Sequence, residues 1–330
     1  MPKVAIIGTG GTISSIGHGP LDLLDYAHTG QKMTVDQLVE KFPVVREAAE
    51  LTLIPYKAVG SPEIGPPHWL DLTRMVHEAV AADPALDGVV ITHGTATTEE
   101  TAYFLNLSLK VPQTVVVVGA QRPSSAESTD AALNLYNAVR VAAAPQSRGM
   151  GTLVMLNDEI QAAREVTKTS TLRLQTFRTA DFGVLGHADG DAIVYYRQPL
   201  RRRAPDTEFD VSGVADLPRV DISYSYGGVD GTAVRAFVEA GAKGIVAASF
   251  APGMSHPAEV AALEEAVRQG VHVVVSTRAG SGRVTQSRAM ESRGFIAADN
   301  LIPQKARILL MLALTRTHDR DEIIRMFAEY

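Results

Sequence analysis

The chain has 330 residues, with 31 Lys and Arg against 37 Asp and Glu, so that its formal net charge is −6. Apolar residues make up 45% of the sequence, which is typical of globular proteins and excludes a disordered chain. The acidic balance argues against nucleic acid or an anionic surface as the main partner. The absence of cysteine excludes disulfides, thiolate metal sites and cysteine nucleophiles.

No apolar stretch approaches the roughly 20 residues that span a membrane, so we expect no membrane association. An apolar run already begins at Val4, and we therefore expect no signal peptide and a cytoplasmic protein. At roughly 150 residues per domain, the length predicts about two domains, each large enough to bury its own core.

Short β-branched runs alternate with amphipathic stretches along the first part of the chain, a pattern typical of a wound α/β sheet. The predicted strands are Val4–Ile7, Leu51–Ile54, Gly88–Ile91, Thr114–Val118 and Thr152–Leu156. The predicted helices are Val35–Glu50, a segment from Trp69 to Val80, Thr98–Leu109 and Ala131–Ala144.

Apolar periodicity is lost near residues 201–219, where three arginines are followed by prolines and aspartates. We predict an N-terminal catalytic α/β domain over residues 1–200, a linker over 201–219 and a smaller C-terminal α/β domain over 220–330. In the last region we expect strands at Val220–Tyr226, Gly244–Ser249 and Val271–Ser276, and helices at Ala233–Ala240, Ala258–Arg268 and, as the last one, Pro303–Thr315.

Glycines follow the first strand in the run Gly8-Thr9-Gly10-Gly11-Thr12-Ile13. Ile13 stands where a dinucleotide fingerprint has its third glycine, and no GK[ST] sequence follows, so neither nucleotide motif is complete. What remains is a flexible turn that presents the Thr12 hydroxyl, and a purely structural turn is the alternative.

A second polar run, from His93 to Glu100, follows the strand Gly88–Ile91. Thr97 and Glu100 have the spacing of a capping box that starts the next helix. Thr95 would then lie just outside the cap with a free hydroxyl near the positive helix end, a suitable place for a nucleophile or an oxyanion hole. The alternative is that these threonines only form the turn and the cap.

A third polar run begins at Asn157, after the strand Thr152–Leu156, and contains Lys168. Ligand sites in wound sheets lie at the carboxyl edge, so we expect Thr12, Thr95 and Lys168 to converge there. A buried lysine with a lowered pKa can activate a hydroxyl. The histidines show no zinc-binding spacing, so no metal is assigned, and His93 either orients its turn or transfers protons.

Taken together and in order, six segments of the chain are similar to the bacterial-type L-asparaginase family over nearly the whole length. They are Ile7–Ile13, Ile91–Leu105, Val118–Pro123, Asn134–Val139, Val166–Thr169 and Pro303–Arg307. The resemblance implies a larger N-terminal wound α/β domain and a smaller C-terminal α/β domain. It also implies hydrolysis of the side-chain amide of a small molecule to an acid and ammonia, without a metal or organic cofactor. The implied assembly is a homotetramer of intimate dimers, with each active site completed by the neighbouring subunit.

Carried over by position, the resemblance makes Thr12 the nucleophile, supported by Tyr26, and makes Thr95 and Lys168 a second catalytic pair. Ser61 matches the serine that holds the α-carboxylate of the substrate. The substrate-binding positions are Gly11, Ser61, Gly94 and Ala96.

The chain departs from the family pattern in one sub-pocket. Ala96 stands where the family motif HGTDT has an aspartate that orients the Thr–Lys pair and holds the substrate's α-ammonium group, and Pro62 replaces a glutamine after Ser61. Two residues that the family's neighbouring subunit contributes are also missing: the position of the asparagine falls within Ala251–Ser255, where this chain has Pro252 and Met254, and the position of the glutamate falls at or near Ala289. Each lost charge-assisted hydrogen bond is worth about 1.5–3 kcal/mol, so we expect asparagine binding to weaken.

The resulting hypothesis is amide hydrolysis with specificity shifted away from L-asparagine. An amide with a carboxylate but no α-amine, a more apolar amide, and a lactam or imide are candidate substrates, and Arg288 and His256 are candidates to enter the altered pocket. Two alternatives stay open: an L-asparaginase with rebuilt amine recognition, and a catalytically silent ligand-binding homologue. The sequence also leaves open which threonine attacks first.

Overall fold

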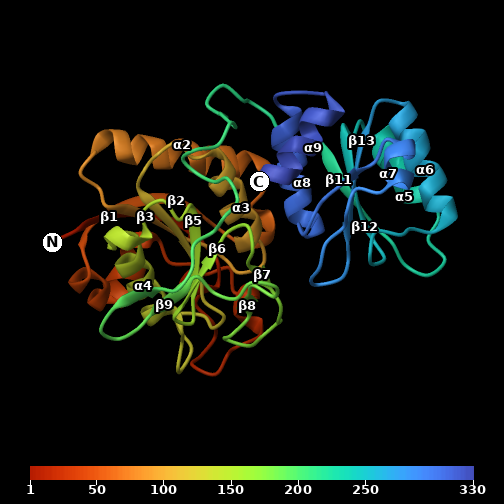
Figure 1. Cartoon of the computed structure of the whole chain (residues 1–330). Coiled ribbons are helices and arrows are strands. Elements are labelled where there is room, and N and C mark those ends of the chain that lie inside the picture. The colour runs from red at the N-terminus through yellow and green to blue at the C-terminus, as the bar shows by residue number, and fades with distance from the viewer. The chain divides into compact units, whose positions relative to one another are not determined.

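The computed structural model describes residues 1–330, which divide into two units, Met1–Asp210 and Val211–Tyr330 (Figure 1). The division falls within residues 201–219, the predicted linker. Ala204, near the start of that segment, is buried in a core cluster of the N-terminal unit. Each unit is built of strands and helices, and the first is the larger, so the predicted α/β fold class is confirmed.

The N-terminal unit contains an eight-stranded mixed sheet with the order β10-β9-β6-β5-β4-β3-β1-β2. Its strands are β1 (Lys3–Gly10), β2 (Glu50–Val59), β3 (Gly88–Thr92), β4 (Thr114–Val118), β5 (Thr152–Leu156), β6 (Glu159–Ala162), β9 (Gly186–Ala188) and β10 (Ile193–Tyr195), and a separate two-stranded sheet pairs β7 (Thr167–Lys168) with β8 (Phe177–Arg178). The helices are α1 (Val35–Lys41), α2 (Pro66–Ala82), α3 (Thr98–Ser108) and α4 (Ala131–Ala143).

The order in which successive parallel strands are added to this sheet reverses between β1 and β3. These two strands are neighbours, yet β1 leads to β2 on one side and β3 leads to β4 on the other. In open α/β sheets, a crevice forms at the carboxyl ends of two strands related in this way, and ligands bind there. The topology therefore directs attention to the residues that follow β1 and β3.

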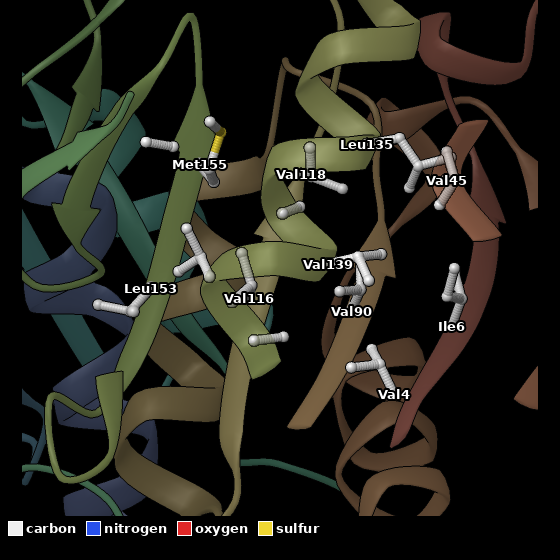
Figure 2. Close-up of a cluster of buried hydrophobic side chains, with 14 of the residues drawn as sticks. Val4, Ile6, Val45, Val90, Val116, Val118, Leu135, Val139, Leu153 and Met155 are labelled. Carbon is white, nitrogen blue, oxygen red and sulfur yellow. The ribbon is translucent and has the colours of Figure 1, made fainter. Parts of the chain in front are cut away.

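Both faces of the inner parallel strands β1, β3, β4 and β5 are buried. Alternate residues point to opposite sides, so Val4 and Ile6 of β1 join one core cluster, while Ala5 and Ile7 join another. Figure 2 shows the first cluster, in which Leu135 and Val139 of α4 pack against the strands. This burial makes the sheet a rigid base for the loops at its edge.

The C-terminal unit is a four-stranded parallel sheet with its strands in sequence order. The strands are β11 (Val220–Tyr224), β12 (Gly244–Ser249), β13 (His272–Thr277) and β14 (Ile296–Ala297), and the helices are α5 (Thr232–Glu239), α6 (Pro257–Arg268), α7 (Arg288–Arg293), α8 (Pro303–Leu314) and α9 (Arg320–Glu329). No helix of the chain is both long and apolar enough to cross a membrane.

Two helix predictions are wrong. The helix expected over Val35–Glu50 ends at Lys41, because Pro43 lacks an amide hydrogen and disfavours helical geometry in the residue before it; a 3₁₀ helix over Pro43–Glu47 follows. The helix ending near Thr315 is not the last one. Asp319 starts α9 by accepting hydrogen bonds from the next amides, a capping signal that apolar periodicity alone does not reveal.

Candidate active site

Two glycines bring the loops after β1 and β3 into direct contact. Gly11 has a positive φ of 79°, and a Cβ atom on it would lie 2.3 Å from the Cα atom of Gly94. A side chain at Gly94 would in turn lie 2.8 Å from the Ser61 hydroxyl oxygen. Only glycine permits this approach, which places Thr12 and Thr95, the residues that follow each glycine, in the same crevice.

The Thr12 hydroxyl oxygen lies 3.1 Å from the Tyr26 hydroxyl oxygen. Thr12 begins a short 3₁₀ turn whose preceding carbonyl, that of Gly11, accepts hydrogen bonds from the Ser14 amide and the Ser15 hydroxyl. Tyr26 is half-buried and belongs to another 3₁₀ turn, Asp25–His28. The structure thus brings together the two residues that the family resemblance pairs.

The loop that carries Tyr26 is organised by the carboxylate of Asp22, a residue that sequence reasoning missed. One Asp22 oxygen accepts hydrogen bonds from the amides of Asp25 (2.8 Å) and Tyr26 (3.1 Å), and the other accepts one from the amide of His18 (3.0 Å). These amide donors stabilise the ionised form and hold the pKa of the Asp22 carboxyl below its usual range. No motif identifies Asp22, because its partners are backbone groups.

Thr95, Lys168 and Gln121 form a three-way contact. The Lys168 amine lies 2.7 Å from the Thr95 hydroxyl oxygen and 3.1 Å from the Gln121 side-chain oxygen, and the Thr95 hydroxyl donates to that same oxygen at 2.9 Å. Thr95 is only 5% exposed. Its hydroxyl is therefore engaged in hydrogen bonds, whereas the sequence predicts a free hydroxyl at this position. Gln121 was not predicted as a site residue, although it follows the carboxyl end of β4 as Thr95 follows that of β3.

Lys168 reaches the site by a longer route than the sequence suggests. The chain does not pass directly from β5 to the site, since β6 first runs back antiparallel to β5. Lys168 then lies on β7, where its backbone amide donates to the Glu99 carboxylate at 2.6 Å. Burial lowers the pKa of the Lys168 amine, and the charge of Glu99 partly opposes this shift. A lysine with a lowered pKa is easier to keep neutral and can then accept a proton.

Ser61 links the loop after β2 to the loop after β3. Its hydroxyl accepts the Ala96 amide hydrogen at 3.2 Å, and its carbonyl accepts the Thr97 hydroxyl at 2.7 Å. The predicted capping box at Thr97 is therefore wrong: α3 does begin at Thr98, but the Thr97 hydroxyl donates to Ser61 and does not cap the helix. The Ala96 side chain is exposed.

His93 orients the turn. It is fully buried, and burial lowers its pKa to about 4, so the ring is neutral. Its Nδ1 atom lies 2.8 Å from the Gly94 carbonyl, which can only accept, so Nδ1 carries the hydrogen. Nε2 then accepts from the Thr101 hydroxyl at 2.9 Å, and that hydroxyl oxygen accepts from the Trp69 indole at 3.0 Å. Both ring nitrogens are therefore engaged, one with the Gly94 carbonyl and the other with the Thr101 hydroxyl.

The two candidates for the altered pocket, His256 and Arg288, lie on different helices of the C-terminal unit. His256 caps α6, with its Nδ1 atom accepting the Ala258 amide hydrogen at 3.2 Å, and Arg288 is an exposed residue at the start of α7. Met254 and Ala289 line a cavity of about 570 Å³. No group of three or more His, Asp or Glu side chains is arranged to hold a metal ion.

The two units correspond to two known protein families. Residues 3–201 match the model described as "Asparaginase, N-terminal", and residues 219–327 match the "Glutaminase/Asparaginase C-terminal domain". The chain is 42% identical to L-asparaginase 2 of Bacillus subtilis, with 100% of this chain and 87% of that protein covered. It is 40% identical to a glutaminase-asparaginase of Pseudomonas fluorescens, with 100% of this chain and 91% of the other covered.

The fold is likewise similar to a solved structure. A crystal structure of the probable cytoplasmic L-asparaginase from Campylobacter jejuni superimposes with a TM-score of 0.95 at 40% identity, and each chain is covered completely. The family models match residues 3–201 and 219–327, and the relatives and the solved structure cover the whole chain. The chain therefore belongs to the asparaginase family and is a hydrolase acting on the carbon–nitrogen bonds of amides.

Proposed function

We propose that this protein hydrolyses the carboxamide of a small molecule through a threonine nucleophile. The observation that carries the proposal is the 2.7 Å contact between the Thr95 hydroxyl and the amine of Lys168, whose pKa is lowered by burial. The 3.1 Å contact between Thr12 and Tyr26 supplies a second hydrogen-bonded hydroxyl, on the loop that touches Gly94. No cofactor takes part in this chemistry.

The reaction proceeds through an ester on the protein. A threonine hydroxyl adds to the amide carbon and gives up its proton to a base. Neutral Lys168 contacts Thr95 directly, whereas the group in contact with Thr12 is the hydroxyl of Tyr26. The tetrahedral intermediate then expels the amide nitrogen, which takes a proton and leaves as ammonia. Water hydrolyses the resulting ester and restores the threonine hydroxyl, so that amide and water give carboxylic acid and ammonia.

The family resemblance assigns the attack to Thr12, whereas the lysine contact favours Thr95 as a second candidate. Acid quenching of the enzyme during turnover, followed by peptide mass spectrometry, locates the ester. We expect it on Thr12, with Thr12→Ala inactive and Thr12→Ser partly active. An ester on Thr95 would make Thr95 the nucleophile. Full activity in both Thr12→Ala and Thr95→Ala would rule out either threonine as the nucleophile.

We further propose a substrate that lacks an α-ammonium group. In support, the exposed side chain at the position of the family's aspartate is the methyl group of Ala96. The nearby carboxylate of Glu99 is buried and accepts the Lys168 amide hydrogen, so it does not replace that aspartate at the surface of the crevice. A lost charge-assisted hydrogen bond of about 1.5–3 kcal/mol weakens ammonium binding by about ten- to a hundredfold.

Ammonia release from a panel of substrates tests the specificity. The panel contains L-asparagine, L-glutamine, succinamic acid, a simple apolar amide and a cyclic imide, with Thr12→Ala as the control. We expect succinamic acid to exceed asparagine in kcat/KM, and Ala96→Asp to reverse that order.

Faster turnover of asparagine than of succinamic acid would favour the alternative of an L-asparaginase, the name that the Bacillus and Campylobacter proteins carry. Ligand binding without turnover, equal in wild type and Thr12→Ala, would favour a silent binding homologue.

We propose a homotetramer of intimate dimers, as the family resemblance implies, and a cytoplasmic location, as named for the Campylobacter protein. Sedimentation equilibrium measures the assembly, and a mass other than four chains contradicts it. Cell fractionation with antibody detection measures the location, and recovery outside the cytoplasmic fraction contradicts it.

A further inference from the structure

Gln121 occupies a fixed position beside the Thr95–Lys168 pair. It follows β4 after Gly119, where a Cβ atom would lie 3.0 Å from the Thr95 side chain, so the two strand ends approach closely. The backbone amide of Gln121 donates to the Asp130 carboxylate at 2.9 Å, and the amide of Arg122 donates to the other oxygen of the same carboxylate. The backbone is thereby held on both sides of the side chain.

The orientation of the Gln121 amide follows from its partners. Its nitrogen lies 3.1 Å from the carbonyl of Arg173 and 3.4 Å from that of Thr171, and carbonyl oxygens only accept. The nitrogen must therefore face these carbonyls, and the oxygen must face the catalytic pair. That oxygen accepts hydrogen bonds from the Thr95 hydroxyl at 2.9 Å and from the Lys168 amine at 3.1 Å.

We propose that Gln121 is the positioning residue of the Thr95–Lys168 pair and performs, as a neutral group, the orienting role that the family's aspartate has at the position of Ala96. This inference rests on the proposed function, because it assumes that the pair takes part in catalysis. In the family the aspartate carboxylate has two roles, and in this chain these two roles are separated. Orientation of the pair passes to Gln121, while recognition of a substrate ammonium group is lost with Ala96.

A neutral acceptor has a different electrostatic effect from a carboxylate. A carboxylate about 3 Å from an ammonium group stabilises the charged form and raises the pKa of the amine. The charge that acts on Lys168 is that of Glu99 of α3, and the Asp130 carboxylate is bonded to the backbone amides of Gln121 and Arg122. With Gln121 uncharged, Lys168 more readily stays neutral and able to accept a proton.

Three variants test this inference. Gln121→Glu adds a charge with little change of shape, Gln121→Met removes the acceptor, and Gln198→Glu adds the same charge at an exposed site as a control. One readout is the pH profile of kcat/KM. The other is the rate at which acetic anhydride modifies Lys168, followed by mass spectrometry against pH, which reports the lysine's protonation without any substrate.

We expect Gln121→Glu to shift both the acid limb of the pH profile and the Lys168 modification curve upward by about one pH unit or more. We expect Gln121→Met to lower kcat at least tenfold without that upward shift, and Gln198→Glu to behave as wild type. An unchanged modification curve in Gln121→Glu, or an unchanged kcat in Gln121→Met, would overturn the inference.

The proposed function and the role of Gln121 can be refuted separately. If Thr12→Ala and Thr95→Ala are both fully active, the proposed function fails, whereas the modification curve still reports whether Gln121 controls Lys168. If activity requires the threonines but the curve does not respond to Gln121→Glu, only the role of Gln121 is refuted.

Discussion

Lys168→Met removes the proposed base and nearly preserves the shape of its side chain. In the wild-type protein the amine donates to the Thr95 hydroxyl and to the Gln121 oxygen. The Thr95–Gln121 hydrogen bond of 2.9 Å does not involve the lysine and stays available in the variant. The variant therefore tests the chemistry of the amine with the threonine still held by one partner.

The expected losses in catalysis and in stability differ greatly. Removing a general base costs about 10²- to 10⁴-fold in rate. The hydrogen bonds of a charged donor are worth about 1.5–3 kcal/mol each, but the amine is half-buried and its burial opposes the charge, so these terms partly cancel. We expect the free energy of unfolding to change by less than about 2 kcal/mol.

Ammonia release at several pH values and urea unfolding measure the two effects. Because Lys168 must be neutral to accept a proton, wild-type kcat/KM should rise with pH through the lysine's pKa, which lies below the ordinary value of 10.5. This rise should vanish in Lys168→Met. Lys41→Met, at an exposed lysine, is the matched control. A loss of less than tenfold, or the same acid limb in the variant, would refute Lys168 as the base.

Three further outcomes follow from the geometry of the site. The pKa of buried His93 is about 4, so between pH 6.5 and 4 the unfolded chain binds a proton that the folded chain does not. The free energy of unfolding should therefore fall by about 3 kcal/mol as the pH is lowered over that range. Urea titrations that show no fall in wild type, or the same fall in His93→Gln, would contradict this. Gly11→Ala should lower the free energy of unfolding by about 1–3 kcal/mol and should also lower kcat, because the added Cβ would collide with Gly94. Wild-type stability measured by calorimetry would show that the two loops can separate. Asp22→Ala should lower kcat about ten- to a hundredfold by releasing the turn that holds Tyr26, and Asp22→Asn should have a smaller effect. Kinetics equal to wild type would show that Asp22 does not position Tyr26.

The sequence predicts the sheet well where burial is uniform. The strands Thr114–Val118 and Thr152–Leu156 have the predicted bounds, because short runs of β-branched and aliphatic residues flanked by turns have few other stable conformations. The convergence of Thr95 and Lys168 was predicted from the rule that ligands bind at the carboxyl edge. The route of Lys168 was not, because the reversal from β5 to β6 depends on a turn with no distinctive sequence.

Contacts made by backbone groups stay outside the reach of sequence patterns. Asp22 acts on amides that every residue possesses, so nothing in its neighbours identifies it. The Thr97 hydroxyl had a regular capping pattern, yet it donates to the carbonyl of Ser61, which is 36 positions away in the sequence. A local rule gave the wrong partner there because a tertiary acceptor competes with the helix end.

The roles proposed for Gln121 and Ala96 would together explain how catalysis persists while substrate recognition changes. A single carboxylate that both orients a catalytic pair and binds substrate cannot be lost without harm to both roles. In this chain the orienting contacts, at 2.9 and 3.1 Å, come from a side chain on a different strand end. On this proposal position 96 has no orienting role, and the Ala96 side chain is exposed. Substitutions at Ala96 should therefore alter KM and the choice of substrate more than kcat, whereas substitutions at Gln121 should alter kcat and its pH dependence.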